Sequence, residues 1–126
     1  MLTLCSGWEL DVERGPDWLL VTVRRPRSAS DVSEPLAESL WALLERHLTH
    51  RLVLELNQIR CLDDDLIDQL LELRERIGQR GGVMRVCGLS SYNRRLLVDR
   101  QLEGELVPYD DREEAVLGCH KPRLPR

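Results

Sequence analysis

The segment from Arg51 to Gly88 constrains the fold more than any other part of the chain. It opens with a continuous apolar run at residues 51–57 (RLVLELN), which predicts a buried strand. From Asp64 to about Arg80 apolar residues recur at helical spacing, and Gly81-Gly82 then ends the predicted helix. The apolar stripe of this helix consists of Leu66, Leu70, Leu73 and Ile77. Because residues 83–88 (VMRVCG) form another strand-like run, the segment predicts a sheet that is at least partly parallel, with right-handed crossovers.

The first half of the chain adds a hairpin and a helix to this unit. Residues 8–23 alternate and then become apolar around the turn Gly15-Pro16-Asp17, which predicts a β-hairpin. Apolar residues at helical spacing from Asp31 to about Leu48 predict a helix that Ser30 or Asp31 caps. Pro35 is then tolerated because it lies in the first turn or so of that helix.

The second half of the chain adds a helix from Ser91 to about Arg100, a short strand at residues 105–109 and a last helical turn or two at residues 111–118. The chain therefore predicts one α/β domain over residues 1–118, with a mixed, mostly parallel sheet of four to five strands and about four helices. Residues 119–126 contain two prolines and several basic residues, and we expect them to form a flexible basic tail.

The composition argues against several classes of function. With a net charge of −4 the chain offers no electrostatic footprint for nucleic acid, and an anionic membrane would repel it on average. No window approaches the roughly 18 apolar residues of a membrane helix, and the first residues do not resemble a leader sequence. We therefore expect a cytoplasmic protein without membrane insertion, in which the four cysteines are reduced.

Three successive carboxylates, Asp63, Asp64 and Asp65, stand where the second predicted helix begins. A metal site is disfavoured because side chains of sequence neighbours diverge and no second acidic group obviously converges on them. Carboxylates at this place cap free amides and complement the positive end of the helix dipole. Capping accounts for two of the acids, so the third has another role or is a solvated surface residue.

The other candidate groups also favour structural roles. His47 and His50 flank the end of the first predicted helix, where a protonated ring suits the negative end of the dipole. Cys119 and His120 lie in the tail and make a poor metal site, and the basic segment Arg24–Arg27 is expected to be a solvated loop. No nucleophile lies in an activated motif and no Gly-rich phosphate loop is present, so we expect neither an enzyme nor a cofactor.

From about Trp8 to Leu117 the chain resembles the STAS family, the domain of bacterial anti-sigma factor antagonists. Members typically combine a hydrophobic strand ending in Asp-Leu, an Asp-Ser-Ser-Gly helix start, a Leu-rich helix closing at Arg-Gly-Gly, and a strand leading into Gly-Leu-Ser. Here these places are taken by Glu55-Leu56, Asp63, the helix through Gly81-Gly82, and Gly88-Leu89-Ser90.

The resemblance implies a regulatory role through protein contact. In family members that act as switches, a kinase-like anti-sigma factor phosphorylates the first serine after the aspartate, and the unmodified form binds that factor. Here Asp64 replaces this serine and Asp65 the next one, while Leu66 and Asp68 replace small residues. The resemblance therefore implies a divergent anti-sigma factor antagonist with a fixed charge at Asp64, whose partner-binding surface comprises Asp63, Asp64, Asp65, Leu66 and Asp68.

Two alternatives remain open at this stage. Some STAS domains are subunits of multi-protein scaffolds or accessory components of transporters, and certain members are thought to bind small ligands or nucleotides. The sequence identifies neither the partner nor the oligomeric state.

Overall fold

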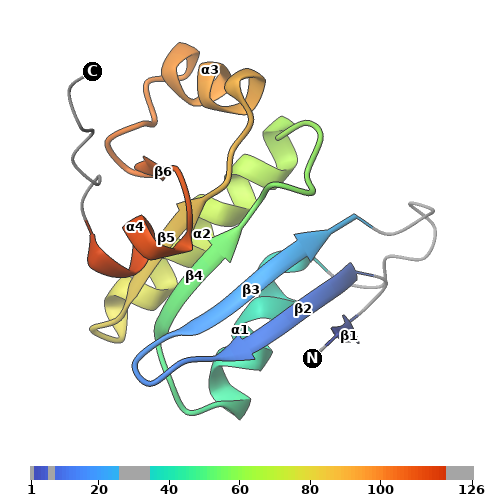
Figure 1. The fold of residues 1–126 in the computed structure, drawn as a ribbon, viewed down its shortest axis with the longest axis vertical. Coiled ribbons are helices and arrows are strands. Elements are labelled where there is room, and N and C mark those ends of the chain that lie inside the picture. Colours follow the sequence, from blue (N-terminus) through green and yellow to red (C-terminus); the bar gives the residue numbers. More distant parts are fainter. Residues whose placement is uncertain (1, 6–7, 26–34, 119–126) are drawn as a thin grey trace, which may run out of the picture.

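The computed structural model describes residues 2–5, 8–25 and 35–118. The elements are β1 (Leu2–Cys5), β2 (Trp8–Arg14), β3 (Leu19–Arg24), α1 (Leu36–Arg46), β4 (Arg51–Glu55), α2 (Asp64–Gln79), β5 (Val83–Cys87), α3 (Ser91–Asp99), β6 (Pro108–Tyr109) and α4 (Arg112–Leu117). The strands form one sheet in sequence order (Figure 1). β1, β2 and β3 pair antiparallel, and β3 to β6 pair parallel. This is the predicted mixed, mostly parallel α/β architecture.

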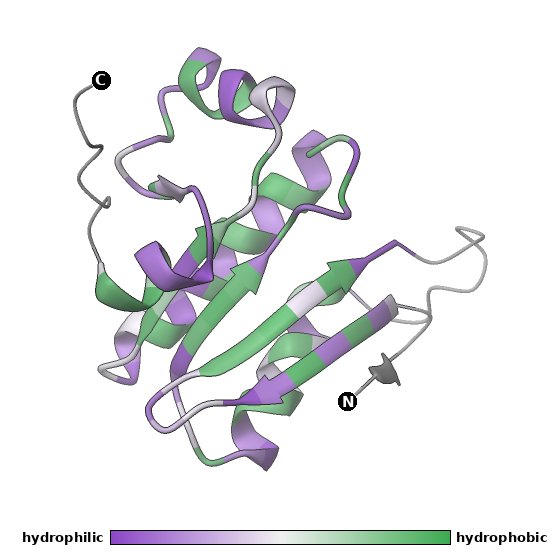
Figure 2. Ribbon diagram, viewed as in Figure 1, coloured by the Kyte–Doolittle hydropathy of each residue, from purple (hydrophilic) through white to green (hydrophobic). Residues whose placement is uncertain are grey.

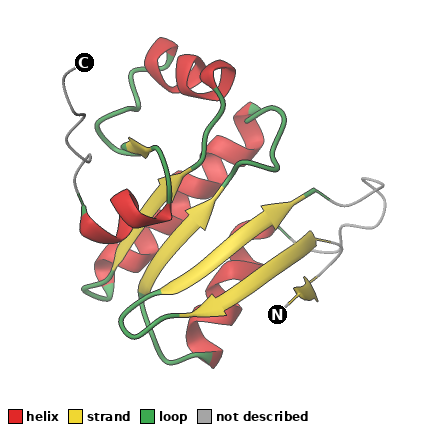
Figure 3. Ribbon diagram, viewed as in Figure 1, coloured by secondary structure: helices red, strands yellow, loops and turns green. Residues whose placement is uncertain are grey.

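Helices lie on both faces of the sheet (Figure 3). α1 and α2 pack on one face and form the main core with the alternate side chains of β2 to β5 that point to them, including Leu10, Val21, Leu54 and Val86. α4 packs on the opposite face, where Trp18, Val53, Cys87, Tyr109 and Ala115 form a smaller apolar cluster. The green and purple bands along α2 in Figure 2 show the stripe that this packing requires.

The predicted helix α2 is confirmed in its position and its buried face. It begins at Asp64, as predicted, and ends at Gln79, one residue before the predicted end. Leu70 and Leu73 are buried against the sheet, with exposed fractions of 1% and 0%. Gly81 follows the helix with a φ of 74°, a left-handed conformation that glycine adopts without steric cost.

Several predicted boundaries differ from the structure. The sheet has six strands where four to five were predicted, because residues 2–5 add an antiparallel edge strand. The last strand is only Pro108–Tyr109, since residues 102–106 form a helical turn in which the amide of Leu106 donates to the carbonyl of Leu102.

The start of α1 also differs from the prediction. Pro35 is extended, with φ −60° and ψ 148°, and its carbonyl accepts the first hydrogen bonds of the helix. Pro35 is therefore the residue before the helix and not part of its first turn. The predicted caps Ser30 and Asp31, like the tail at residues 119–126, lie outside the described residues.

Candidate functional site at the start of α2

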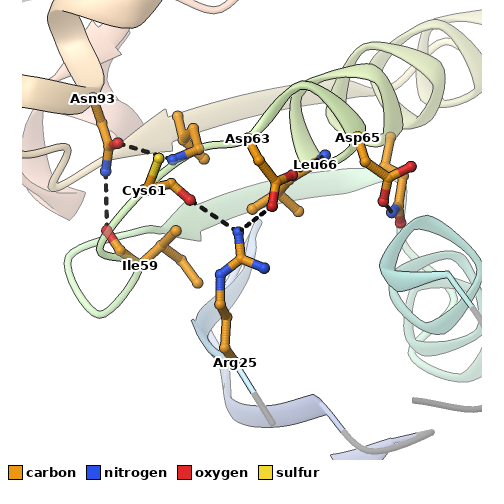
Figure 4. A network of polar contacts seen from close by, with 9 residues as sticks. Arg25, Ile59, Cys61, Asp63, Asp65, Leu66 and Asn93 are labelled. Atoms are coloured by element: carbon orange, nitrogen blue, oxygen red, sulfur yellow. Dashed lines mark hydrogen bonds and ion pairs between the residues drawn. The ribbon is translucent and has the colours of Figure 1, made fainter. Parts of the chain in front are cut away.

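The helix begins after an aspartate cap that also forms an ion pair. Asp63 is extended, and its Oδ1 accepts a hydrogen bond of 2.8 Å from the amide of Leu66. Its Oδ2 accepts a hydrogen bond of 2.9 Å from the guanidinium of Arg25 (Figure 4). Asp63 is thus the capping residue of α2, so the cap does not depend on Asp64.

Arg25 ties the end of β3 to the loop before α2. The same guanidinium nitrogen donates to the carbonyl of Cys61 at 2.9 Å, and the group lies 5.9 Å from the ring centroid of Trp8. Arg24 and Arg25 are exposed, as expected of a solvated segment, but Arg25 also holds these specific contacts; residues 26 and 27 lie outside the described residues. A contact across 38 residues has no local signature in the sequence.

Asp64 and Asp68 lie on an exposed face of α2 and share one counter-ion. The Asp64 side chain is 89% exposed and that of Asp68 is 69% exposed. Arg100, at the end of α3, approaches Asp64 at 3.0 Å and Asp68 at 3.7 Å. Ion pairs this exposed contribute little to stability, so both carboxylates remain available to a partner.

Asp65 participates in a contact between the two helices. Its Oδ2 accepts a hydrogen bond of 2.8 Å from the side-chain Nε2 of Gln69, one helical turn later. The Oε1 of Gln69 in turn accepts a hydrogen bond of 3.2 Å from the backbone amide of Ala37 in α1. The third acid therefore helps to orient a residue that joins α1 to α2.

A fully buried asparagine holds the loop that leads into the site. Asn93 of α3 is 0% exposed; its Oδ1 accepts from the amide of Leu62 and its Nδ2 donates to the carbonyl of Ile59, each at 2.9 Å (Figure 4). These bonds fix the chain on either side of Cys61, directly before the acidic residues. The role of Asn93 is not predictable from the sequence, because an asparagine in a helix has no pattern that indicates burial.

Leu66 does not belong to the exposed surface. It is 2% exposed and packs in the main core. The expectation that Leu66 contributes bulk to a docking surface is therefore wrong: its position in the helix turns the side chain toward the sheet, whereas Asp64 and Asp68 point away from it.

The acids of the site do not converge on a common point. Asp63 points to Arg25, Asp64 to Arg100, and Asp65 to Gln69. Among the described residues no three histidine, cysteine or carboxylate side chains are arranged to hold a metal ion. In the same part of the chain, no helix combines the length and apolar character needed to cross a membrane.

A separate cavity of about 310 Å³ lies near the carboxyl ends of β4 and β5. It is lined by Glu55, Asn57, Cys87, Gly88, Asp110, Asp111 and Arg112. Arg112 is held by ion pairs to Glu55 and Glu13, so its charge is already matched. Burial raises the pKa of Cys87 from 9.0 to about 12, so this thiol is not a nucleophile at neutral pH. Three of the lining residues carry carboxylates, which do not favour a nucleotide phosphate.

The family model for the STAS domain matches residues 9–115, which is most of the chain. The chain belongs to the STAS domain family. The match covers β2 to the first half of α4 and thus includes the acidic start of α2. A search of curated protein sequences found no match.

Solved structures share the fold of this STAS domain at low sequence identity. An anti-sigma factor antagonist from Mycobacterium paratuberculosis is 18% identical with a TM-score of 0.69, over 86% of this chain and 91% of that chain. A variant of RsbS from Moorella thermoacetica with glutamate in place of a serine is 13% identical with a TM-score of 0.69, over 86% and 92% of the two chains. SLC26A9 matches at 17% identity with a TM-score of 0.63, over 81% of this chain but only 19% of its own.

Proposed function

We propose that this STAS domain is a non-enzymatic regulator of the anti-sigma factor antagonist type, which binds a kinase-like protein partner through the start of α2 and carries a fixed charge at Asp64. The proposal includes a bacterial signalling role and a cytoplasmic location. The observation that carries it is the exposure of Asp64: its side chain is 89% exposed, one residue after the aspartate that caps the helix.

The helix cap and the proposed fixed charge belong to two different residues, Asp63 and Asp64. If Asp64 capped α2, its carboxylate would be explained by helix stability alone. Asp63 performs that role, so the charge of Asp64 is not needed for the cap. Asp64 follows the family's aspartate directly, at the place where switch members of the family carry a phosphorylatable serine.

The proposed contact surface consists of Asp63, Asp64, Asp65 and Asp68. Tyr92 of α3 lies near Cys61, two residues before Asp63, and its interaction with Cys61 raises the pKa of Tyr92. Tyr92 is 59% exposed, and exposed tyrosines often contribute much of the binding energy at protein interfaces. A partner would thus meet a negative rim next to one aromatic side chain.

A fixed charge is expected to weaken the complex without abolishing it. Phosphoserine carries about −1.5 to −2 charge and three acceptor oxygens, whereas a carboxylate has one charge and two oxygens. Arg100 offsets part of the charge of Asp64 within the free domain. We therefore expect Asp64→Ser and Asp64→Ala to bind a kinase-like anti-sigma factor more tightly than the native chain, and Asp64→Ser to accept phosphate if Asp68 does not obstruct docking.

The test is titration calorimetry of the native chain and both variants against the kinase-like partner obtained by co-purification. The matched control is Glu75→Ser, which removes an exposed carboxylate from the far half of α2. The proposal predicts higher affinity for the two Asp64 variants and no change for the control. Equal affinities of the native chain and Asp64→Ala would show that Asp64 is only a residue of the first helical turn.

A second candidate function is that of a STAS subunit in a scaffold or transporter complex. The match to 19% of the SLC26A9 chain supports it, because the fold there forms a part of a much longer protein. Co-purification separates the two candidates, since a kinase-like factor, a large assembly and a transporter component differ in size and composition.

A further inference from the structure

The four helices end in the same backbone conformation but with different residue types. A residue with a positive φ lies two positions after the end of α1, α2 and α3 and directly after α4: φ is 54° at Leu48, 74° at Gly81, 58° at Gln101 and 76° at Gly118. Two of these residues are glycine and one is a polar glutamine. Leu48 alone places a large apolar side chain at such a position among the described residues, and that side chain is 90% exposed.

Leu48 is unfavourable for the isolated fold in two ways. A left-handed conformation costs free energy for any residue with a Cβ, and glycine would avoid that cost. A leucine side chain that is 90% exposed gains almost nothing from burial. A strained residue without a structural benefit points to a contact outside the domain.

Three arginines belong to this turn or to the neighbouring turn after α2. Arg46 ends α1, Arg51 begins β4 and Arg80 follows α2; all three are exposed, and none forms an ion pair within the described part of the chain. Two of these guanidinium groups lie over tryptophan rings, that of Arg51 at 4.4 Å from the centroid of Trp18 and that of Arg80 at 5.6 Å from the centroid of Trp41. The turn after α1 and the turn after α2 are in contact, because the amide of Val83 donates to the carbonyl of His50 at 2.9 Å. Figure 1 shows the ends of α1 and α2 at the lower part of the molecule.

The acids of the candidate site are too far away to cancel this charge. α2 has 16 residues, so its two ends are about 24 Å apart. Electrostatic interactions between exposed charges are screened beyond about 8 Å at physiological ionic strength. Glu45, next to Arg46 in sequence, and Asp17, in the hairpin turn at the same end of the sheet, offset two of these charges, and Arg14 of the hairpin adds one. The chain is negative overall, but this end of it is positive.

We propose that Leu48, with Arg46, Arg51 and Arg80, docks on an anionic lipid surface. The arginines bind headgroups, and Leu48 inserts at the boundary between headgroups and acyl chains. A protein partner is disfavoured because a stable interface buries about 800 Å² on each side around an apolar or aromatic centre, and this turn offers one aliphatic side chain. In this orientation the acidic start of α2 faces away from the membrane, open to a protein partner.

The experiment is co-sedimentation of the full chain with vesicles of phosphatidylcholine, with and without about 30% phosphatidylserine, at low and at high salt. The native chain is expected to bind only the vesicles with phosphatidylserine, and only at low salt. Leu48→Gly is expected to lower the partition constant severalfold while raising the melting temperature, because it removes the strain. Arg46→Gln is expected to lower the partition constant roughly fivefold.

Two variants serve as controls. Gln101→Gly changes the equivalent residue after α3, and Arg95→Gln removes an exposed charge from α3; both should bind as the native chain does. The proposal is overturned if the native chain does not bind phosphatidylserine vesicles at low salt, if it binds both vesicle types equally, or if Leu48→Gly binds without loss. The proposal is also overturned if the native chain binds neither vesicle type but forms dimers that Leu48→Gly dissociates. That result would assign the turn to a contact with a second copy of the protein.

Discussion

Replacing Asn93 tests the argument that a buried amide positions the candidate site. Asn93→Ala leaves the amide of Leu62 and the carbonyl of Ile59 without their partners, in a region where Asn93 is 0% exposed. Each buried group without a partner costs about 1–3 kcal/mol, so the free energy of unfolding is expected to fall by about 2–6 kcal/mol. That is a large share of the roughly 5–15 kcal/mol by which a domain is stable.

A second variant separates the two hydrogen bonds of Asn93. Asn93→Asp keeps an oxygen that accepts from Leu62, but it places an oxygen against the carbonyl of Ile59 and buries a charge. At neutral pH it is expected to destabilise the domain at least as much as Asn93→Ala. At acid pH the protonated carboxyl can donate to Ile59, so the difference from the native chain should shrink.

The assay is urea unfolding followed by tryptophan fluorescence, since the chain contains three tryptophans. The matched control is Asn57→Ala, which truncates an exposed asparagine and should change stability by no more than about 0.5 kcal/mol. A loss under about 1 kcal/mol for Asn93→Ala, or an equal loss for Asn57→Ala, would refute the claim that Asn93 holds the loop.

Three further predictions follow from the packing and the cap. Asp63→Ala removes the cap of α2 and should cost about 1–2 kcal/mol in urea unfolding, whereas Asp64→Ala should cost under about 0.5 kcal/mol; the reverse order would contradict the assignment of the cap. Leu70→Ala or Leu73→Ala should lower the free energy of unfolding by about 2–5 kcal/mol. A loss under about 1 kcal/mol for both variants would mean that the buried face is misassigned. Cys87, whose pKa burial raises to about 12, should resist a thiol reagent at pH 8 in the native state and react on unfolding; rapid native labelling would contradict its burial.

The sequence predicted the helices and strands best where the periodicity is long. The apolar stripe from Leu66 to Ile77 correctly predicted the start and the buried face of α2, and it predicted the end of the helix to within one residue. Predictions failed where an element is short or lies at an edge. The strand at residues 2–5 was missed, and the last strand shrank to Pro108–Tyr109, because pairing at a sheet edge depends on neighbours and not on local pattern.

The candidate site was predicted only in part. The sequence located the three acids at the start of α2, but it did not separate their roles or show that Leu66 is buried. It also did not indicate that Tyr92 lies near Cys61 in the loop before the acids, because that contact depends on how α3 returns past this loop.

The sequence by itself determined the order of the strands and helices from β2 onward, the apolar faces of α1 and α2 and the acidic start of α2, because these follow from the spacing of residues close together in the chain. Only the tertiary structure decided what each acid does. Arg25 is 38 residues from Asp63, Arg100 is 36 residues from Asp64, and Asn93 is 31 residues from Leu62. These pairs meet because the parallel crossovers bring the ends of β3, β4 and β5 to the same end of the sheet, and no local pattern records which side chains then face one another.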